Sequence, residues 1–253
     1  MSESDYAFLK EHCQLGVDFN ALTEEQKEWL LRTRIIMSKN AMRYKWNKVL
    51  AGWYSAKSGE CLHIINSIDQ LATTITPQIQ KDLCSEFNGI LQPTLSLVIG
   101  MPVTVLKNLY KYLKVNNGSE GILRDVLYDA TNNQPKALMI EMIDADFEVE
   151  GLPKNTILVQ RDTTTCQKVF GNAKVAWKRH QFPITEAFCI TDYKVQGLTL
   201  PSALVKLGDG NGVSAYVKLS RTKNRETTRI LDGFTLKDLT IVIPDGYKVR
   251  VKE

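Results

Sequence analysis

The sequence has no long hydrophobic run, and none of its apolar stretches approaches the roughly 18 residues that a membrane-spanning helix requires. The first five residues are acidic and lack the basic and then apolar order of a secretory signal. Internal repeats and low-complexity tracts are also absent. The composition, 43% hydrophobic and 24% charged over 253 residues, is typical of a folded domain. We therefore expect an intracellular protein with no membrane partner.

Cysteine and histidine are few and scattered, which bears on metal binding. A zinc site needs ligand pairs only a few residues apart, and the three histidines do not supply them. We therefore expect no metal site and interpret the cysteines as reduced, small hydrophobic residues. The five cysteines form no C-x-x-C pair: Cys13, Cys61, Cys84, Cys166 and Cys189.

Charge is spread unevenly along the chain, although the net value is only +4. Residues 1–160 hold 16 Lys/Arg against 19 Asp/Glu, whereas residues 161–253 hold 16 against 9. The basic excess is therefore C-terminal. It fits either a solvated basic surface or an attraction to phosphate groups, and charge alone does not choose between them.

Strands and helices alternate near the N-terminus in the order of an α/β domain. The predicted elements are a helix opened by the capping-box pattern at residues 23–26, a buried strand at Arg34–Met37, a helix capped by Asn40 with Met42, Trp46 and Val49/Leu50 on its apolar face, an apolar run at residues 61–65, and a helix from Thr76-Pro77 to Gly89.

The pattern changes to short, closely spaced strands near Pro93 and returns to α/β character near Pro183. Strands are predicted at residues 95–99, 103–106, 121–127, 138–143 and 156–160, then at 187–190, 203–207 and 228–231, with a helix at 213–221. This order favours a β-rich barrel-like insertion that splits one α/β domain. The predicted organisation is an N-terminal helical extension (1–33), an α/β domain (34–94 and 184–243), an inserted small β-barrel (95–183) and a tail (244–253).

Three segments in a fixed order point to one family. The first runs from Pro93 to Asn108, contains Gly100-Met-Pro-Val103, and is followed by Asn117-Gly-Ser-Glu-Gly121. The second runs from Phe182 to Thr199 and ends in Thr191-Asp-Tyr-Lys-Val-Gln-Gly-Leu-Thr199. The third is Ala215-Tyr-Val-Lys-Leu-Ser-Arg221. Together they resemble the Gly-Met-Pro-Val…Asn-Gly passage, motif V and motif VI of Pif/RecD-type superfamily 1 DNA helicases, over about residues 34–231. The Thr-Asp-Tyr-Lys variant is similar to Pif-like helicases of fungal genomes and rolling-circle transposons.

The resemblance implies the fold and the roles of the motif residues. It implies a second RecA-like motor domain, of the P-loop NTPase type, with an inserted small β-barrel. Motif V would lie between the ATP cleft and a single-stranded DNA track, with Lys194, Gln196 and Gly197 at the nucleotide and Tyr193, Lys194 and Thr199 at DNA. Arg221 would be the catalytic arginine that reaches the γ-phosphate of ATP, a role that suits a planar, always charged guanidinium. The alternative for Arg221 is a cation placed favourably at a helix C-terminus.

Other motif positions have more ordinary interpretations. Asn117-Gly118 reads as a tight turn between strands, with a DNA contact as the alternative. Lys178 and Arg179 belong to a short basic cluster that either touches the DNA backbone or is simply solvated. Tyr216, Val217 and Leu219 are interpreted as packing residues, and Lys218, where the family usually has Ala, as a surface-compatible change. Tyr193 and Val195 replace the usual His and Ser of motif V.

Two signatures of the intact family are missing from the sequence. No Gly-x-x-x-x-Gly-Lys-Ser/Thr loop is present to cradle phosphates, and no strand ending in Asp-Glu precedes Arg34 to hold magnesium. ATP and Mg²⁺, the cofactors of the family, are therefore not expected to bind tightly to this chain alone, and it is not expected to hydrolyse ATP by itself. The expected partners are single-stranded DNA and an N-terminal motor domain, in the nucleus. A non-catalytic nucleic-acid-binding module and a decayed transposon-derived remnant are the alternatives.

Overall fold

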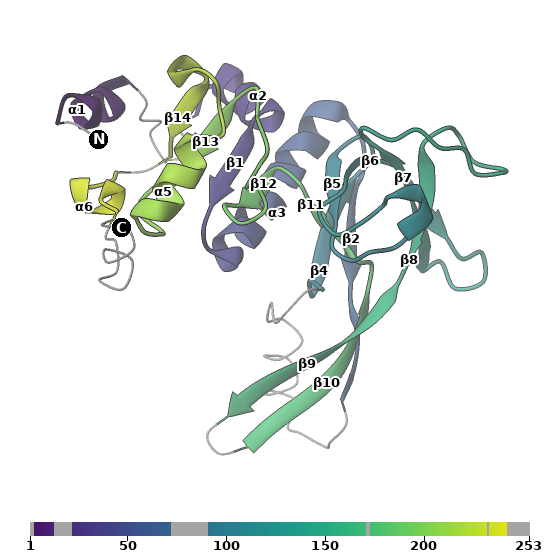
Figure 1. Ribbon diagram of the computed structural model, residues 1–253. Helices are drawn as coiled ribbons and strands as arrows, with labels where there is room; N and C mark the ends of the chain where they lie inside the picture. The colour runs from purple at the N-terminus through teal and green to yellow at the C-terminus, as the bar shows by residue number, and fades with distance from the viewer. Residues whose placement is uncertain (1–2, 13–21, 72–90, 171–172, 232, 242–253) are drawn as a thin grey trace. The chain divides into compact units, whose positions relative to one another are not determined.

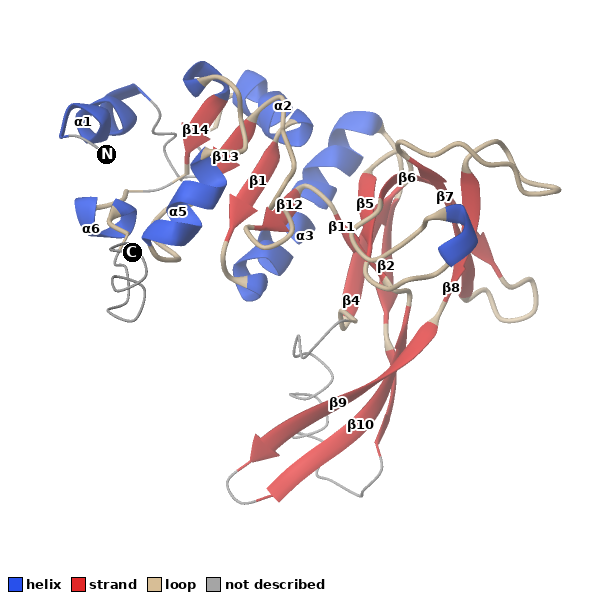
Figure 2. Cartoon of the chain, in the orientation of Figure 1, coloured by secondary structure: helices blue, strands red, loops and turns tan. Residues whose placement is uncertain are grey.

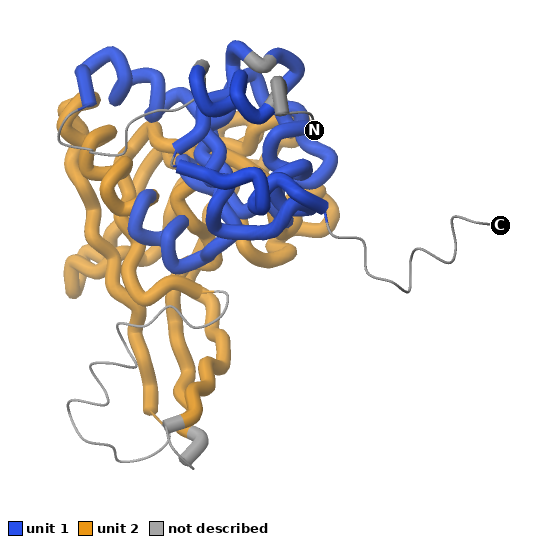
Figure 3. The backbone as a smooth tube through the Cα atoms, turned by 90° about the vertical axis from the view of Figure 1, so that its left-hand side faces the viewer, with its two compact units in different colours: residues 1–46, 188–253 blue, residues 47–187 orange. Residues whose placement is uncertain are grey.

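The computed structural model describes residues 3–12, 22–71, 91–170, 173–231 and 233–241. The chain forms a mixed α/β structure with several sheets (Figures 1 and 2). It divides into two compact units, drawn in different colours in Figure 3. Unit 1 contains residues 1–46 and 188–253, and unit 2 contains residues 47–187. Within the described part of the chain, no helix combines the length and hydropathy needed to cross a bilayer.

Unit 1 is built on a four-stranded, fully parallel sheet in the order β12-β1-β13-β14. Its strands are β1 (Arg34–Met37), β12 (Cys189–Thr191), β13 (Ala203–Val205) and β14 (Thr228–Ile230). They are almost wholly buried, as expected of parallel strands covered on both faces. All four coincide with apolar runs that the sequence marks as strands. The sheet therefore brings together segments from opposite ends of the sequence.

Helices α1 (Glu3–His12), α2 (Glu24–Arg32), α5 (Gly212–Leu219) and α6 (Leu236–Leu239) also belong to unit 1. The capping box predicted at Thr23 is confirmed, because its hydroxyl accepts from the Gln26 backbone and the Gln26 side chain accepts from the Thr23 backbone. Helix α5 connects β13 to β14, so these three elements make a parallel β-α-β unit. In α1, the Tyr6 ring packs edge-on against Phe234 at 5.4 Å between ring centroids.

Helix α3 (Asn40–Ser58) begins in unit 1 and continues into unit 2. Its buried positions, Arg43, Trp46, Asn47, Leu50 and Ala51, recur at helical spacing. The predicted apolar face is correct for Trp46 and Leu50 but wrong for Val49, which is 42% exposed. The predicted helix from Thr76 to Gly89 and the predicted tail lie outside the described residues.

Unit 2 holds the other strands, and all of its pairings are antiparallel. A five-stranded sheet has the order β11-β5-β6-β7-β8, β2 pairs with β4, and a third sheet has the order β3-β10-β9. The strands are β2 (Leu62–Asn66), β3 (Ile68–Leu71), β4 (Thr94–Val98), β5 (Pro102–Val105), β6 (Glu120–Tyr128), β7 (Pro135–Met142), β8 (Thr156–Gln160), β9 (Asp162–Phe170), β10 (Ala173–Gln181) and β11 (Ile184–Glu186). The predicted β-rich composition is thus present, while the closure of these strands into a barrel stays a prediction.

Candidate functional site

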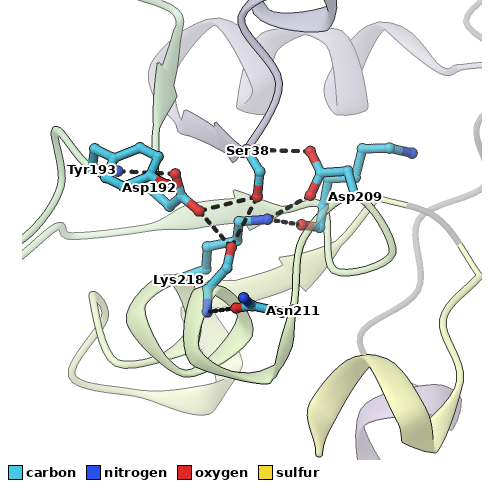
Figure 4. Close-up of polar contacts among 8 residues, drawn as sticks. Ser38, Asp192, Tyr193, Asp209, Asn211 and Lys218 are labelled. Atoms are coloured by element: carbon cyan, nitrogen blue, oxygen red, sulfur yellow. Dashed lines mark hydrogen bonds and ion pairs between the residues drawn. The ribbon is translucent and has the colours of Figure 1, made fainter. Parts of the chain in front are cut away.

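Three loops of unit 1 meet where β1, β12 and β13 end, and their polar side chains form a connected cluster (Figure 4). Ser38 follows β1, Asp192 follows β12, and Asp209 lies in the loop after β13. Ligands of open α/β sheets characteristically bind at this carboxyl edge. We call these three residues, with Ser214 and Lys218 of α5, the edge cluster.

Asp192 is the acceptor at the centre of the edge cluster. Its Oδ2 accepts from the Ser38 hydroxyl at 3.0 Å and the Ser214 hydroxyl at 2.5 Å, and its Oδ1 accepts from the Tyr193 backbone N–H at 3.0 Å. The two serine oxygens also lie 2.9 Å apart, so the three contacts share only two hydroxyl protons. Asp192 thereby ties the start of the motif V loop to the first turn of α5.

The sequence suggested a surface position for Lys218, but its side chain is wholly buried. Its ammonium group donates to Asp209 Oδ1 at 2.6 Å and to the Lys206 carbonyl at 2.5 Å, and the Asp209 side chain is only 2% exposed. The other Asp209 oxygen accepts from the Ser38 backbone N–H at 2.7 Å. The long side chain of Lys218 reaches inward from α5, a direction that helical position alone does not reveal. Burial lowers the pKa of the nearby Lys206. Asp209 opposes this shift, whereas Lys218 and Lys39 add to it.

Gly210, in the loop that carries Asp209, lies close against two serines of the edge cluster. A Cβ built on Gly210 would lie 2.6 Å from the Ser214 hydroxyl and 2.7 Å from that of Ser38. Asn211 then caps α5, since its side chain accepts from the Ser214 backbone N–H at 3.0 Å. A larger residue at position 210 would force the two serines away from Asp192.

Arg221 fixes the motif V loop to the other end of α5. Its guanidinium donates to the carbonyls of Val195 at 3.2 Å and Leu198 at 3.3 Å, and also to that of Val217 in the last turn of α5 at 2.8 Å. Ser214 lies in the first turn of α5, and Arg221 follows its C-cap residue Ser220. The loop is therefore held at both ends of the helix.

The ends of motifs V and VI also run side by side. The Leu200 N–H donates to the Arg221 carbonyl at 2.8 Å, and Leu200 forms a parallel bridge with Thr222. Beside this contact lies an open pocket of about 290 Å³. Its lining is Thr199, Leu200, Pro201, Lys223, Asn224 and Thr227, and we call it the Thr199 pocket.

The motif V loop presents most of the predicted ligand residues to solvent. Tyr193 is 78% exposed, Gln196, Gly197 and Thr199 are exposed, and Lys194 is half-buried. Gly197 has φ +81°, a left-handed conformation that favours glycine. Val195 is wholly buried in the core of unit 1, which explains an apolar residue at that position.

Two packing interpretations in motif VI have different outcomes. Val217 and Leu219 pack against the core of unit 1, as predicted. Tyr216 is 63% exposed, so its predicted packing role is wrong. Position 216 faces outward because the inward faces of α5 are occupied by Ala215 and Lys218, both buried.

The predicted DNA-contact residues of unit 2 fall in two different environments. Asn117 is exposed in a turn in which the Ser119 N–H donates to the Asn116 carbonyl and Gly118 has φ +97°, so the predicted turn is confirmed. Lys178 is exposed on β10. Their DNA contacts stay predictions.

Arg179, by contrast, is wholly buried and forms a two-pronged ion pair with Asp69 of β3, with Nη2 2.7 Å and Nε 3.0 Å from the carboxylate oxygens. This placement speaks against the predicted DNA contact and gives Arg179 a structural role. The sequence did not show it because Arg179 alternates with solvent-facing Lys178 on a strand, and its partner comes from a distant segment.

Sequence reasoning did not select the members of the edge cluster. The signal that could have found them is the Gly208-Asp-Gly-Asn-Gly212 run between a buried strand and a helix. In the described residues, no group of three or more His, Cys, Asp or Glu side chains is arranged to hold a metal ion.

Neither protein-family models nor curated protein sequences match the chain. Solved structures do. The Pif1 helicase of Candida albicans is similar with a TM-score of 0.65 at 18% identity, over 100% of this chain and 54% of that one. Bacteroides Pif1 bound to ssDNA has a TM-score of 0.56 at 19% identity, over 100% of this chain and 54% of that one. Bacteroides Pif1 in complex with ADP-AlF3 and ssDNA has a TM-score of 0.56 at 21% identity, over 91% of this chain and 50% of that one.

The chain thus spans about half the length of these helicases. At this identity the similarity establishes the fold alone. The chain shares the fold of a Pif1-like helicase, which confirms at the level of fold the resemblance to the C-terminal half of a Pif/RecD-type helicase.

Proposed function

We propose that the chain is the C-terminal motor-domain portion of an ATP-dependent DNA helicase. Unit 1 is the second RecA-like domain, and unit 2 contains the barrel-like insertion. The chain supplies Arg221 and part of a single-stranded DNA track. The phosphate loop and the magnesium ligands, which its sequence lacks, come from an N-terminal motor domain. ATP and Mg²⁺ then bind between that domain and unit 1.

The observation that supports this function is the attachment of the motif V loop to both ends of α5. Asp192 holds it to Ser214, and Arg221 holds it to the helix end. The loop exposes Tyr193 and Gln196 between Asp192 and Leu198, which also accepts from Arg221, and it exposes Thr199 directly after Leu198. A loop fixed in this way transmits a shift of α5 directly to the groups that face DNA, which is the coupling that a motor requires.

The catalytic part is tested by adding the missing half. An N-terminal motor domain with a phosphate loop, fused ahead of Met1, is expected to give DNA-stimulated ATP hydrolysis that neither part shows alone. A colorimetric phosphate assay with and without single-stranded DNA measures it. Robust turnover by the unfused chain, or none by a folded fusion that binds ATP, would contradict the proposal.

The Thr199 pocket supports the DNA part. Lys223 is exposed at its rim, and Thr199, Asn224 and Thr227 offer hydroxyl and amide groups, the types that contact nucleic-acid backbones. Lys223→Ala is expected to weaken binding of an oligothymidylate about tenfold, because a charge-assisted hydrogen bond is lost. The slope of log affinity against log salt should fall by about 0.7.

Lys154→Ala is the matched control, since Lys154 is 61% exposed in unit 2 and pairs with Asp146. Fluorescence anisotropy at several salt concentrations measures both variants. Equal effects of the two substitutions on affinity would contradict a DNA contact at the Thr199 pocket.

A further inference from the structure

A short loop of unit 2 carries an aromatic side chain, Tyr112, that is fully exposed to solvent. The loop joins β5 to β6 and is closed at its base by the Asn117 N–H, which donates to the Asn108 side chain at 2.9 Å. Within it, Tyr110 and Val115 form an antiparallel bridge around the 3₁₀ turn Lys111–Leu113. We call residues 108–117 the Tyr112 loop.

The Tyr112 loop is well braced. The Tyr110 hydroxyl donates to the Leu158 carbonyl at 2.7 Å, and the Val115 N–H donates to the Tyr110 carbonyl at 3.1 Å. Val115 is buried, and the Asn116 side chain donates to the Lys114 carbonyl at 3.3 Å. These contacts fix the backbone on both sides of residue 112.

Tyr112 itself takes no part in this bracing. Its exposed fraction is 102%, and within the described residues its hydroxyl makes no hydrogen bond. Lys111 and Lys114, on either side, are exposed as well. A single exposed apolar side chain is ordinary, but a fully exposed ring on a braced turn between two lysines contributes nothing to the core.

Charge along this part of the chain is of one sign. Residues 106–119 contain three lysines and no acidic residue. The first, Lys107, is paired with Asp162 at 2.6 Å, so the positive charge of the loop is that of Lys111 and Lys114. An aromatic face flanked by cations matches an unstacked base with its neighbouring phosphates.

We propose that the Tyr112 loop is a second contact for single-stranded DNA, in which a base stacks on Tyr112 and Lys111 and Lys114 bind the adjacent phosphates. The inference rests on the proposed function in that the ligand is the same strand. It concerns a different unit and different residues from the Thr199 pocket. Stacking needs only the face of a base, so the contact is independent of sequence.

Photo-crosslinking separates the two sites. The full chain is irradiated with an oligothymidylate in which single positions carry 5-iododeoxyuridine, and crosslinked peptides are identified by mass spectrometry. A crosslink to Tyr112 supports the inference. Crosslinks confined to unit 1 overturn it but leave the proposed function standing. A chain that neither binds nor crosslinks overturns both.

Substitutions give a quantitative test by anisotropy with the same oligonucleotide. Tyr112→Ala is expected to weaken binding about 5- to 100-fold, while Tyr112→Phe, which keeps the ring, should remain within about twofold of the original affinity. Lys111→Ala with Lys114→Ala should reduce the salt slope by about 1.4. Equal affinity of the Ala and Phe variants, at unchanged thermal stability, would contradict base stacking.

Discussion

Replacing Asp209 by alanine is expected to lower the free energy of unfolding by about 3–5 kcal/mol. The substitution leaves the Lys218 ammonium group wholly buried, with the Lys206 carbonyl as its one remaining acceptor among the described residues. It also removes the acceptor of the Ser38 backbone N–H. A buried charge without its partner destabilises the folded state by more than the intact pair stabilises it, so the expected loss of stability is large. Urea denaturation followed by circular dichroism measures it.

Two controls accompany this prediction. Removing both charges, with Asp209→Leu and Lys218→Met together, should cost far less, because no buried charge remains. Glu141→Ala, which breaks an ion pair with Arg124 that is about half exposed, should cost no more than about 1 kcal/mol. If Asp209→Ala costs no more than Glu141→Ala, Lys218 is not buried in solution.

Replacing Arg221 by alanine is expected to lower DNA-stimulated turnover of the fused protein by about 10³-fold or more, the effect of losing an arginine at the transferring phosphate. Arg221→Lys should be nearly as damaging, because a single ammonium group does not reproduce the planar fork that reaches Val195 and Leu198 together.

The same phosphate assay measures the arginine variants. Arg124→Ala, on the surface of unit 2, serves as the control that removes an arginine elsewhere. Turnover by Arg221→Ala within tenfold of the original would contradict a catalytic role. The side chain would then serve only to tie the motif V loop to α5.

Local patterns in the sequence predicted much of the fold. The capping box at Thr23 gave the start of α2, and the apolar runs gave the four parallel strands. These features depend on neighbouring residues, which the sequence shows directly. Strands β9 and β10 were missed because one face of each is polar, with Thr163, Thr165 and Lys178 among its residues.

The candidate site was predicted less completely. Motif resemblance selected the exposed residues of the motif V loop, but it did not reveal which charges are buried. Lys218 and Arg179 both looked solvent-facing, since their partners Asp209 and Asp69 are brought to them by tertiary structure. Pairing across a fold follows from topology and not from local spacing.

Single-stranded DNA binding is the part of the proposed function that is tested with this chain alone, without an added phosphate loop. Its direct measurement is anisotropy of a labelled oligothymidylate titrated with the full chain over a range of salt. The proposed function predicts that the chain binds the single strand more tightly than a blunt duplex. Log affinity should fall linearly with log salt concentration, with a slope of about −0.7 for each phosphate neutralised. No binding at low salt, or an affinity that salt does not change, would contradict it.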